Sequence, residues 1–305
     1  MDDPLAEVVS LLQPRAAYSK VVSAAGSWQV RRAEAGRPFY CVVLEGTCRL
    51  EARGHEPMIL EKDDFVLIPS AFDFATSSLE PPPGDMVDEP VQLRPGEFRV
   101  GRQDGPSDLR MLIGYCTFGL GDKTLLVSLL PRLLHVRGEE RLTSLVQLVG
   151  DEAREHRPGR DVILVRLLEV MLIEALRSTT GGAISPGLVR GLSDENLAKA
   201  LRQMHAHPTL PWTVGRLAKE AGLSRSVFFD RFGRAVGVAP MEYLLGWRMA
   251  LAKNMLSRGE GGIAQVAERV GYGSASTFSV AFTRHVGLPP SHYARSDAPC
   301  HEDIQ

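Results

Sequence analysis

The chain has 305 residues and a formal net charge of −2, and 44% of its residues are hydrophobic, 24% charged and 7% aromatic. This composition is typical of a globular protein of about two domains, and it excludes a collagen-like repeat, a wholly disordered chain and a small disulfide scaffold. No apolar run approaches the roughly 18 residues of a membrane span, and the acidic start lacks the basic segment of an export signal. We therefore expect a cytoplasmic protein without a membrane partner.

The cysteines of the chain do not have the spacing of a metal site or a disulfide framework. They stand at Cys41, Cys48, Cys116 and Cys300, and no two of them form a C-x-x-C pair. In a long chain of this kind, such cysteines are expected to be reduced thiols.

Short β-rich runs separated by turn signals dominate the sequence up to about Phe118. The predicted strands cover residues 27–32, 39–44, 47–52, 58–60, 65–69 and 110–118. Glu45-Gly46 lies between two of these runs and predicts a tight hairpin turn, because glycine tolerates positive φ. Residues 81–105 are rich in proline, glycine and charge, which predicts a surface excursion. Many short strands without intervening helices favour a small antiparallel barrel or sandwich.

The apolar residues then take on the period of helices. Helices are predicted over residues 125–134, 139–155 and 161–177. The last of these is apolar on almost every face, so it must be covered on more than one side. It is either a core helix of the barrel domain or the seam of a homodimer. Residues 178–187 are small and polar and predict a flexible linker.

The predicted barrel carries little of the chemistry of a metal or catalytic site. His55 is the only histidine among the predicted strands, and one histidine cannot form the two- or three-histidine site of a metal-dependent cupin. The chain also lacks a nucleophile elbow, a zinc-protease motif and a phosphate-binding glycine loop. We therefore expect no catalytic residue, no metal and no cofactor.

Four residues of the barrel remain as candidates for binding a ligand: Cys41, Phe72, Phe74 and Cys116. The two phenylalanines are predicted either to pack in the core or to line a pocket. In the predicted hairpin, Cys41 lies diagonal to Cys48 on one face, and Cys116 ends another strand. A thiol sensor is thus an alternative to the ordinary role of such cysteines as small buried hydrophobic residues.

An internal repeat decides the interpretation of the C-terminal third. Five residues recur 50 positions later, namely Phe228, Phe232, Gly237, Pro240 and Tyr243 as Phe278, Phe282, Gly287, Pro290 and Tyr293. Each copy has the pattern of a short helix, a glycine-containing turn and a second helix, which is the layout of a helix-turn-helix. Residues 197–296 hold 13 Lys and Arg against 5 Asp and Glu, a net charge of +8 that indicates a polyanionic partner.

Local signals predict where these helices begin and end. Thr213, Ser224 and Ser274 are predicted N-caps, because their hydroxyls can accept hydrogen bonds from the first free amides of a helix. Gly222 and Gly271 allow the left-handed conformation that ends the preceding helix. A helix of about 17 residues, or roughly 25 Å, joins the copies. It sets them apart by somewhat less than the ~34 Å of one DNA turn.

Residues 192–295 resemble the DNA-binding domain of AraC-type (AraC/XylS) bacterial transcription regulators through W-T-V-G-R-L-A-K-E-A-G-L-S-R-S-V-F-F-D-R-F, A-P-M-E-Y-L-L-G-W-R-M-A-L-A and V-A-E-R-V-G-Y-G-S-A-S-T-F-S-V-A-F. The N-terminal half resembles the cupin-like sensor domains of one branch of that family through F-Y-C-V-V-L-E-G-T-C-R-L, L-E-K-D-D-F-V-L-I-P and L-L-P-R-L-L-H-V.

The resemblance implies an α+β protein. Residues 1–180 would form a cupin-like antiparallel β-barrel with a helical dimerisation segment, and residues 181–191 a linker. An all-α domain of two tandem helix-turn-helix units would follow over residues 192–296, ahead of a tail over residues 297–305.

A helical wheel with the repeated phenylalanines facing the core gives the candidate DNA-binding residues on the opposite face of each second helix. They are Arg225, Ser226, Phe229, Asp230, Arg231 and Arg234 in the first copy and Ser276, Thr277, Ser279, Val280, Thr283 and Arg284 in the second.

AraC-type sequences commonly have an arginine at the positions of Asp230 and Val280. Whereas arginine pairs bidentately with guanine, aspartate only accepts, for instance from cytosine N4, and valine only contacts a thymine methyl. We therefore expect phosphate contacts to supply a larger share of the affinity, from Arg225, Arg231, Arg234, Arg284 and Arg248.

The sequence thus predicts a one-component transcription regulator rather than an enzyme. Its expected partners are double-stranded promoter DNA, a second copy of the chain and a small-molecule or redox effector, with RNA polymerase as a further candidate. Two alternatives remain open, a thiol-responsive regulator and a cupin enzyme fused to a DNA-binding domain.

Overall fold

A computed structural model describes residues 3–32, 37–70, 73–83, 87–118, 125–155, 157–178 and 187–296. The chain divides into two compact units. One unit, here called the sheet unit, comprises Gln13–Phe118 and Pro131–Ile184. The other, here called the helical unit, comprises Met1–Leu12, Gly119–Leu130 and Ser185–Gln305.

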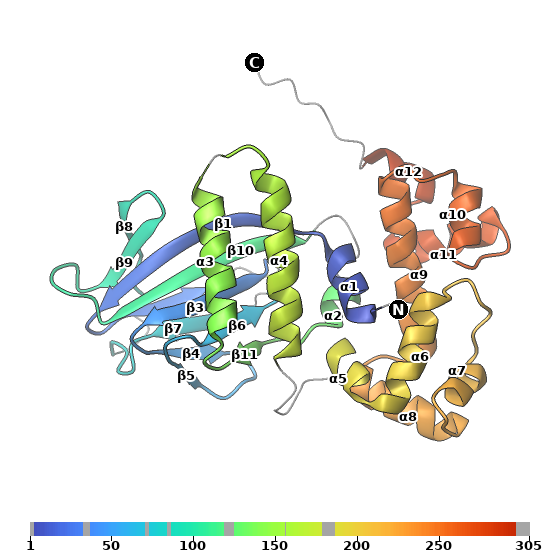
Figure 1. The fold of residues 1–305 in the computed structure, drawn as a ribbon, viewed down its shortest axis with the longest axis horizontal. Coiled ribbons are helices and arrows are strands. Elements are labelled where there is room, and N and C mark those ends of the chain that lie inside the picture. The colour runs from blue at the N-terminus through green and yellow to red at the C-terminus, as the bar shows by residue number, and fades with distance from the viewer. Residues whose placement is uncertain are drawn as a thin grey trace, which may run out of the picture. The chain divides into compact units, whose positions relative to one another are not determined.

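The described strands of the sheet unit form two sheets (Figure 1). The seven-stranded sheet has the order β11-β6-β3-β10-β1-β9-β8, and the four-stranded sheet has the order β2-β7-β4-β5. The strands are β1 (Pro14–Ala25), β2 (Gln29–Arg32), β3 (Phe39–Glu45), β4 (Cys48–Ala52), β5 (Met58–Leu60), β6 (Phe65–Ile68), β7 (Phe74–Ser77), β8 (Val91–Arg94), β9 (Glu97–Gly101), β10 (Leu109–Phe118) and β11 (Leu134–Val136).

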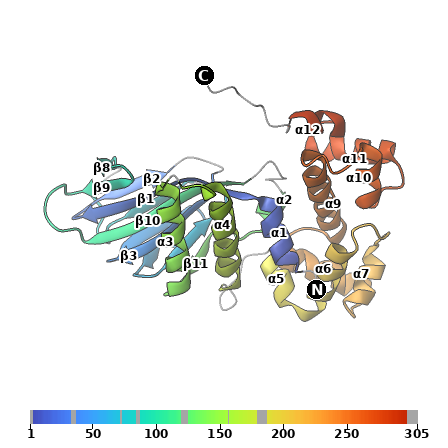
Figure 2. The same ribbon diagram turned by 45° about the horizontal axis from the view of Figure 1, so that its top comes forward.

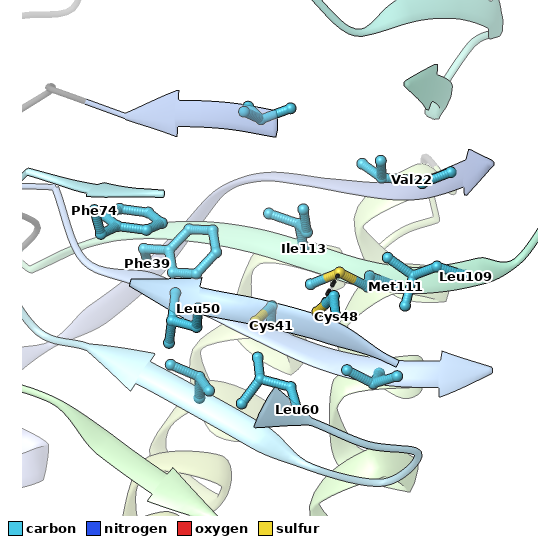
Figure 3. Close-up of a cluster of buried hydrophobic side chains, with 14 of the residues drawn as sticks. Val22, Phe39, Cys41, Cys48, Leu50, Leu60, Phe74, Leu109, Met111 and Ile113 are labelled. Carbon is cyan, nitrogen blue, oxygen red and sulfur yellow. Dashed lines mark hydrogen bonds between the residues drawn. The ribbon is translucent and has the colours of Figure 1, made fainter. Parts of the chain in front are cut away.

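Alternating side chains of both sheets meet in one hydrophobic core (Figure 3). From the seven-stranded sheet, Cys41 on β3 and Met111 on β10 point inward, and from the four-stranded sheet Cys48 and Leu50 on β4 do so. The sulfur atoms of Cys48 and Met111 lie 3.8 Å apart. This two-sheet packing agrees with the cupin expectation, since period-two patterning buries one face of each strand.

Helices α3 (Glu140–Arg154) and α4 (Arg160–Arg177) lie side by side across the other face of the seven-stranded sheet (Figure 1). Helix α3 packs closely on the sheet at Gly150. A Cβ built on this glycine would lie only 2.9 Å from the Leu112 side chain of β10, so a larger residue would not fit there without a shift. On α4, Leu164, Leu168 and Leu172 are buried. The sequence pattern predicted both helices to within two residues at each end.

Several strands differ from the sequence expectation. The predictions missed β1, because Ala, Ser and Lys make up most of its length and carry little strand signal. They also missed β7, and they assigned β8 and β9 to a surface excursion. The pair β1 and β9 is parallel, so an antiparallel barrel is wrong at that pair. The helix predicted over residues 125–134 is only α2 (Leu125–Ser128), and β11 begins at Leu134.

The predicted hairpin at Glu45-Gly46 is wrong, because β3 and β4 belong to different sheets. The turn carries the chain from one sheet to the other. Gly46 does adopt the expected positive φ, at 82°. A Cβ at this position would also lie 2.0 Å from the carbonyl oxygen of Asp108. Cys41 and Cys48 are therefore not diagonal partners in a hairpin, although both point into the same core.

The helical unit is built around the long helix α9 (Pro240–Ser257). Figure 2 shows α6 and α7 at one end of α9 and α10 to α12 at its other end. The other described helices of this unit are α1 (Pro4–Leu12), α2 (Leu125–Ser128), α5 (Leu188–Ser193), α6 (Glu195–Ala206), α7 (Val214–Glu220), α8 (Arg225–Val236), α10 (Ile263–Arg269), α11 (Ala275–Val286) and α12 (Pro290–Ser296).

The first helix of the chain packs in this helical unit. Glu7 joins α1 to α6, because its Oε2 lies 2.6 Å from Nδ1 of the buried His205 on α6. Nε2 of His205 lies 2.7 Å from the Tyr243 hydroxyl, and its ring stacks on Trp247 with centroids 3.9 Å apart. A buried polar network of this kind specifies one arrangement, and no local sequence signal announces it.

One of the two predicted linkers overlaps α5. Residues 188–191 of the predicted linker 181–191 are helical and pack against α6 and α8. Between the ends of the linker predicted over 178–187, residues 179–186 lie outside the described part of the chain. No described helix is both long enough and apolar enough to cross a bilayer.

Gly46→Ala should destabilise the sheet unit by about 3 kcal/mol, the sum of left-handed strain and an overpacked contact with Asp108. Gly54→Ala is the matched control, because the φ of Gly54, 83°, is nearly that of Gly46 but nothing lies within 4 Å of an added Cβ. We expect the control to cost only about 1 kcal/mol. Urea unfolding of both variants measures the difference, and equal losses would contradict the close contact at Gly46.

Candidate nucleic-acid interface and sheet interior

Each half of the helical unit contains a short helix, a turn and a second helix, as predicted. Ser224 caps α8 by accepting a hydrogen bond from the Val227 amide, and Ser274 caps α11 in the same way from Thr277. Thr213 likewise caps α7 through the Arg216 amide. The turn glycines Gly222 and Gly271 have φ of 65° and 82°. The N-caps and turn glycines predicted from the sequence are thus confirmed.

The aromatic cores of the two halves have the same geometry. In the first half, Phe228 and Phe232 have ring centroids 5.5 Å apart, and Phe232 meets Tyr243 edge-on at 5.8 Å. In the second half, the Phe278–Phe282 distance is 5.4 Å, and Phe282 meets Tyr293 edge-on at 5.6 Å. All four phenylalanines are fully buried, which confirms them as core residues. The packing therefore turns the opposite faces of α8 and α11 outward.

The outward face of α8 carries most of the candidates predicted for it. Arg225, Ser226, Asp230 and Arg234 are exposed, and Phe229 is 46% exposed. An exposed phenylalanine between charged and hydroxyl side chains provides an apolar surface with hydrogen-bonding groups beside it. This mixture suits the edges of DNA bases.

The outward face of α11 is less charged. Ser276, Thr277 and Arg284 are exposed, and Val280 is 71% exposed. Ser279 and Thr283 are half-buried and donate their hydroxyl hydrogens to the carbonyls of Ala275 at 2.7 Å and Ser279 at 2.8 Å. Their oxygens remain able to accept, whereas their hydrogens are already used.

Two arginines predicted to contact phosphate have partners inside the protein. Arg231 pairs with Asp194, the residue that caps α6. Arg248 donates to the carbonyls of Pro208 at 2.7 Å and Leu210 at 2.8 Å, and burial lowers the pKa of its guanidinium. The partners lie 37 to 40 positions away, so a helical wheel could not reveal them.

The wheel also left out exposed residues near the same surface. Val227 is exposed on α8, one position from Ser226. On α7, Arg216 and Lys219 are exposed, and the guanidinium of Arg216 lies 5.1 Å from the Trp212 ring centroid. The net charge of +8 over residues 197–296 was the available signal for these residues, because it includes cations outside α8 and α11.

The cysteines of the sheet unit lie in environments that oppose thiolate formation. Cys41, Cys48 and Cys116 are buried. Burial raises the pKa of the Cys48 and Cys116 thiols to about 12 and that of Cys41 well above its usual value. Cys41 points into the core between the sheets, whereas Cys116 points to the opposite face, near Tyr40. Of the three thiols considered for a sensor, Cys116 is thus separated by the sheet from Cys41 and Cys48, which share the core between the sheets.

Of the other ligand candidates, Phe74 is a core residue whose ring centroid lies 4.7 Å from that of Phe39 (Figure 3). Phe72 lies outside the described residues. Across the part of the chain that the structure describes, no group of three or more His, Cys, Asp or Glu side chains is placed to hold a metal ion.

Comparisons with known proteins agree with this architecture. A family described as Cupin matches residues 3–181, and one described as Helix-turn-helix domain matches residues 217–296. A putative AraC-like transcription regulator of Streptomyces lividans is 35% identical over 96% of this chain and 98% of its own. Another, of Streptomyces antibioticus, is 34% identical over 97% of this chain and 100% of its own.

Among solved structures, a transcriptional regulator from Chromobacterium violaceum, described among AraC-type DNA-binding domain-containing proteins, is 25% identical. The match covers 35% of this chain and 96% of that one, with a TM-score of 0.33.

Thiol labelling tests the environments of the three buried cysteines. At pH 8 a thiol of pKa about 12 is ionised in about 1 molecule in 10,000, against about 1 in 4 for an ordinary cysteine. Iodoacetamide should therefore leave Cys41, Cys48 and Cys116 unmodified in the folded protein and modify all three in urea, as read by peptide mass spectrometry. Rapid labelling of Cys41 or Cys116 in the folded protein would restore the thiol-sensor hypothesis.

The pH dependence of the free energy of unfolding also tests whether burial raises the pKa of these thiols. Because the folded-state pKa values lie above those of the unfolded chain, the thiols stabilise the fold fully below about pH 9. That stabilisation should be lost as the pH rises towards 12.

Proposed function

The chain belongs to the AraC-like transcription regulators, and from this premise we propose that its two helix pairs, α7–α8 and α10–α11, bind one promoter duplex together. The supporting observation is the repeated aromatic core, which presents α8 and α11 by the same internal packing. The helix α9 between them has 18 residues, or about 27 Å. That length is somewhat shorter than one DNA turn, so the duplex is expected to bend modestly.

In this proposal α8 and α11 enter successive major grooves as recognition helices. Asp230 accepts a hydrogen bond from a cytosine amino group, and Val280 contacts a thymine methyl group. Phosphate contacts fall to the exposed Arg225, Arg234 and Arg284. Arg231 remains a candidate only if phosphate competes with Asp194 for its guanidinium.

The sheet unit takes the role of the sensor, and its signal acts by shifting a population of states of the regulator. The covalent path from sensor to DNA-binding helices is short at the start of the chain. The helix α1 ends at Leu12 and β1 begins at Pro14. Glu7 of α1 contacts His205 within the helical unit, so we infer that the signal passes along the chain from β1 to α1.

The regulator is proposed to be a homodimer through α4. This helix has one face buried in the sheet unit, and its other side exposes Val162 (66%), Ile163 and Val170 (41%). Leu148 on the neighbouring helix α3 is also exposed. We propose that these side chains form one apolar patch, which would be typical of a protein–protein interface. Both interpretations of this helix, core and seam, then apply to different faces of it.

Selection of genomic fragments by the purified full-length protein tests the DNA-binding function. We expect recovery of a small set of duplexes bound at least about 1000-fold more tightly than a random duplex of equal length at the same salt concentration. Fluorescence anisotropy measures both affinities. Equal binding of selected and random duplexes would contradict a sequence-specific regulator.

Asp230→Arg tests whether the outward face of α8 lies on the DNA. One added phosphate contact releases about one counterion, so the plot of log affinity against log salt should steepen by about 0.9. Glu56→Arg makes the same change of charge on an exposed residue of the sheet unit and should leave the slope unchanged. An unchanged slope for Asp230→Arg would remove Asp230 from the interface.

Val170→Glu tests the dimer seam, because it places an unpaired charge on the exposed apolar side of α4. Sedimentation velocity should show a dimer for the unmodified protein and a monomer for the variant. Ile59→Glu is the control, since Ile59 is an exposed apolar residue on the edge strand β5. A dimer in all three proteins would place the seam elsewhere.

A further inference from the structure

Arg248 ties the long helix α9 to a loop of the first half of the helical unit. It lies midway along α9. Its guanidinium donates two hydrogen bonds, from Nε to the Pro208 carbonyl at 2.7 Å and from Nη2 to the Leu210 carbonyl at 2.8 Å. Both acceptors belong to the connection between α6 and α7. The planar fork of an arginine holds two acceptors in one geometry, whereas the ammonium of a lysine is a single point of contact.

The loop that accepts these hydrogen bonds is held in shape by its own contacts. Trp212, at its end, is only 6% exposed. The indole Nε1 of Trp212 donates to the His207 carbonyl at 2.9 Å, and its backbone amide donates to the Leu210 carbonyl at 2.8 Å. The Leu210 amide donates to the His207 carbonyl at 3.2 Å. Arg248 therefore binds a closed turn between two helices of the first half.

The turn of the second half lies against the same loop. A Cβ built on Gly271, between α10 and α11, would lie 2.9 Å from the Thr209 Cα and 3.0 Å from both the Pro208 carbonyl oxygen and Nη2 of Arg248. Gly271 also has a φ of 82°, so its conformation and its surroundings both require glycine. The backbones of the two halves thus meet at Gly271 and Thr209, and the guanidinium of Arg248 lies beside this contact.

The matching turn of the first half is open. Gly222, the repeat counterpart of Gly271, has a φ of 65° and nothing within 4 Å of an added Cβ. A turn of this kind therefore forms without a neighbouring loop, and the close approach at Gly271 is specific to the junction between the halves. It gives the second half a contact with the first that does not run along α9.

A contact beside α9 restricts motions that the helix alone permits. Long helices bend, so two units joined only by one helix can change their spacing and relative rotation. At this junction, such a bend must either separate Gly271 from Thr209, press them together or break the hydrogen bonds of Arg248. The distance and rotation between α8 and α11 are then set before DNA is bound, which is preorganisation.

We propose that Arg248 is a positioning residue that fixes the spacing of α8 and α11, so that the regulator recognises the distance between two DNA segments as well as their sequences. This inference rests on the proposed binding of one duplex by both helix pairs. One added base pair displaces a segment by about 3.4 Å along the DNA axis and about 34° around it. A fixed pair of helices cannot follow that displacement.

The test compares spacing variants of a duplex selected from the genome. Hydroxyl-radical footprinting with the full-length protein locates the two contacted segments, and one base pair is then inserted or removed between them. Fluorescence anisotropy measures the affinity for each duplex at one salt concentration. The unmodified protein should bind each altered duplex at least about 100-fold more weakly than the selected one, because one set of base contacts is lost.

Arg248→Lys keeps the charge but does not hold both carbonyls, so the penalty for altered spacing should fall to about tenfold or less. The readout is the ratio of affinities for the selected and altered duplexes. A variant that is only less stable loses binding to all duplexes equally, and its ratio stays at the unmodified value.

Gly271→Ala tests the same junction without changing Arg248, because the added methyl group must displace the loop at Thr209. It should also reduce the spacing penalty to about tenfold or less. Gly222→Ala is the matched control, since it introduces similar left-handed strain into an open turn. It should keep the penalty of the unmodified protein.

The outcomes separate this inference from the proposed function. The positioning role is overturned if Arg248→Lys keeps the full spacing penalty, if Gly222→Ala reduces the penalty as much as Gly271→Ala does, or if the unmodified protein binds all spacings equally. Each of these results leaves sequence-specific DNA binding intact. Failure of the unmodified protein to prefer any selected duplex over a random one would instead overturn the proposed function.

Discussion

The edge-on packing of a phenylalanine against a tyrosine from the following helix organises the DNA-binding half of this protein. Phe232 with Tyr243, and Phe282 with Tyr293, make this contact at nearly equal distances and angles. Aromatic rings in such arrangements bury a large area and fix orientation as well as separation. Once the inner face of each second helix is fixed, its outer face is determined by the 100° step of the helix. Every proposed DNA contact depends on that rotation.

The same logic explains how much of the fold could be predicted from the sequence. The aromatic contacts join residues 11 positions apart, and the caps at Ser224 and Ser274 act within one turn. Interactions between residues so close in the chain can be predicted from the sequence. The turn at Gly46 is different: glycine predicted its positive φ, but whether the next strand pairs or crosses to another sheet is decided by distant strands. The missed strand β1 likewise owes its existence to pairing with β10 and β9.

The candidate site divides in the same way. Exposed positions such as Ser226 and Val280 follow from helical period alone, and the structure exposes them. Whether an arginine is available to a phosphate depends on partners that the period does not reveal. Arg231 and Arg248 have such partners.

The chemistry of the two outward faces has a consequence for the operator under the proposed docking. The halves share a core but differ where they meet DNA, since α8 presents a carboxylate at Asp230 and α11 an isopropyl group at Val280. A carboxylate near phosphates is tolerated only where a base donor compensates it, which makes Asp230 an element of exclusion as much as of attraction. A valine contributes no such penalty. The two half-sites contacted by one chain are then unequal, with the stricter sequence requirement under α8. Any twofold symmetry of the operator must come from a second chain, because the internal repeat does not supply it.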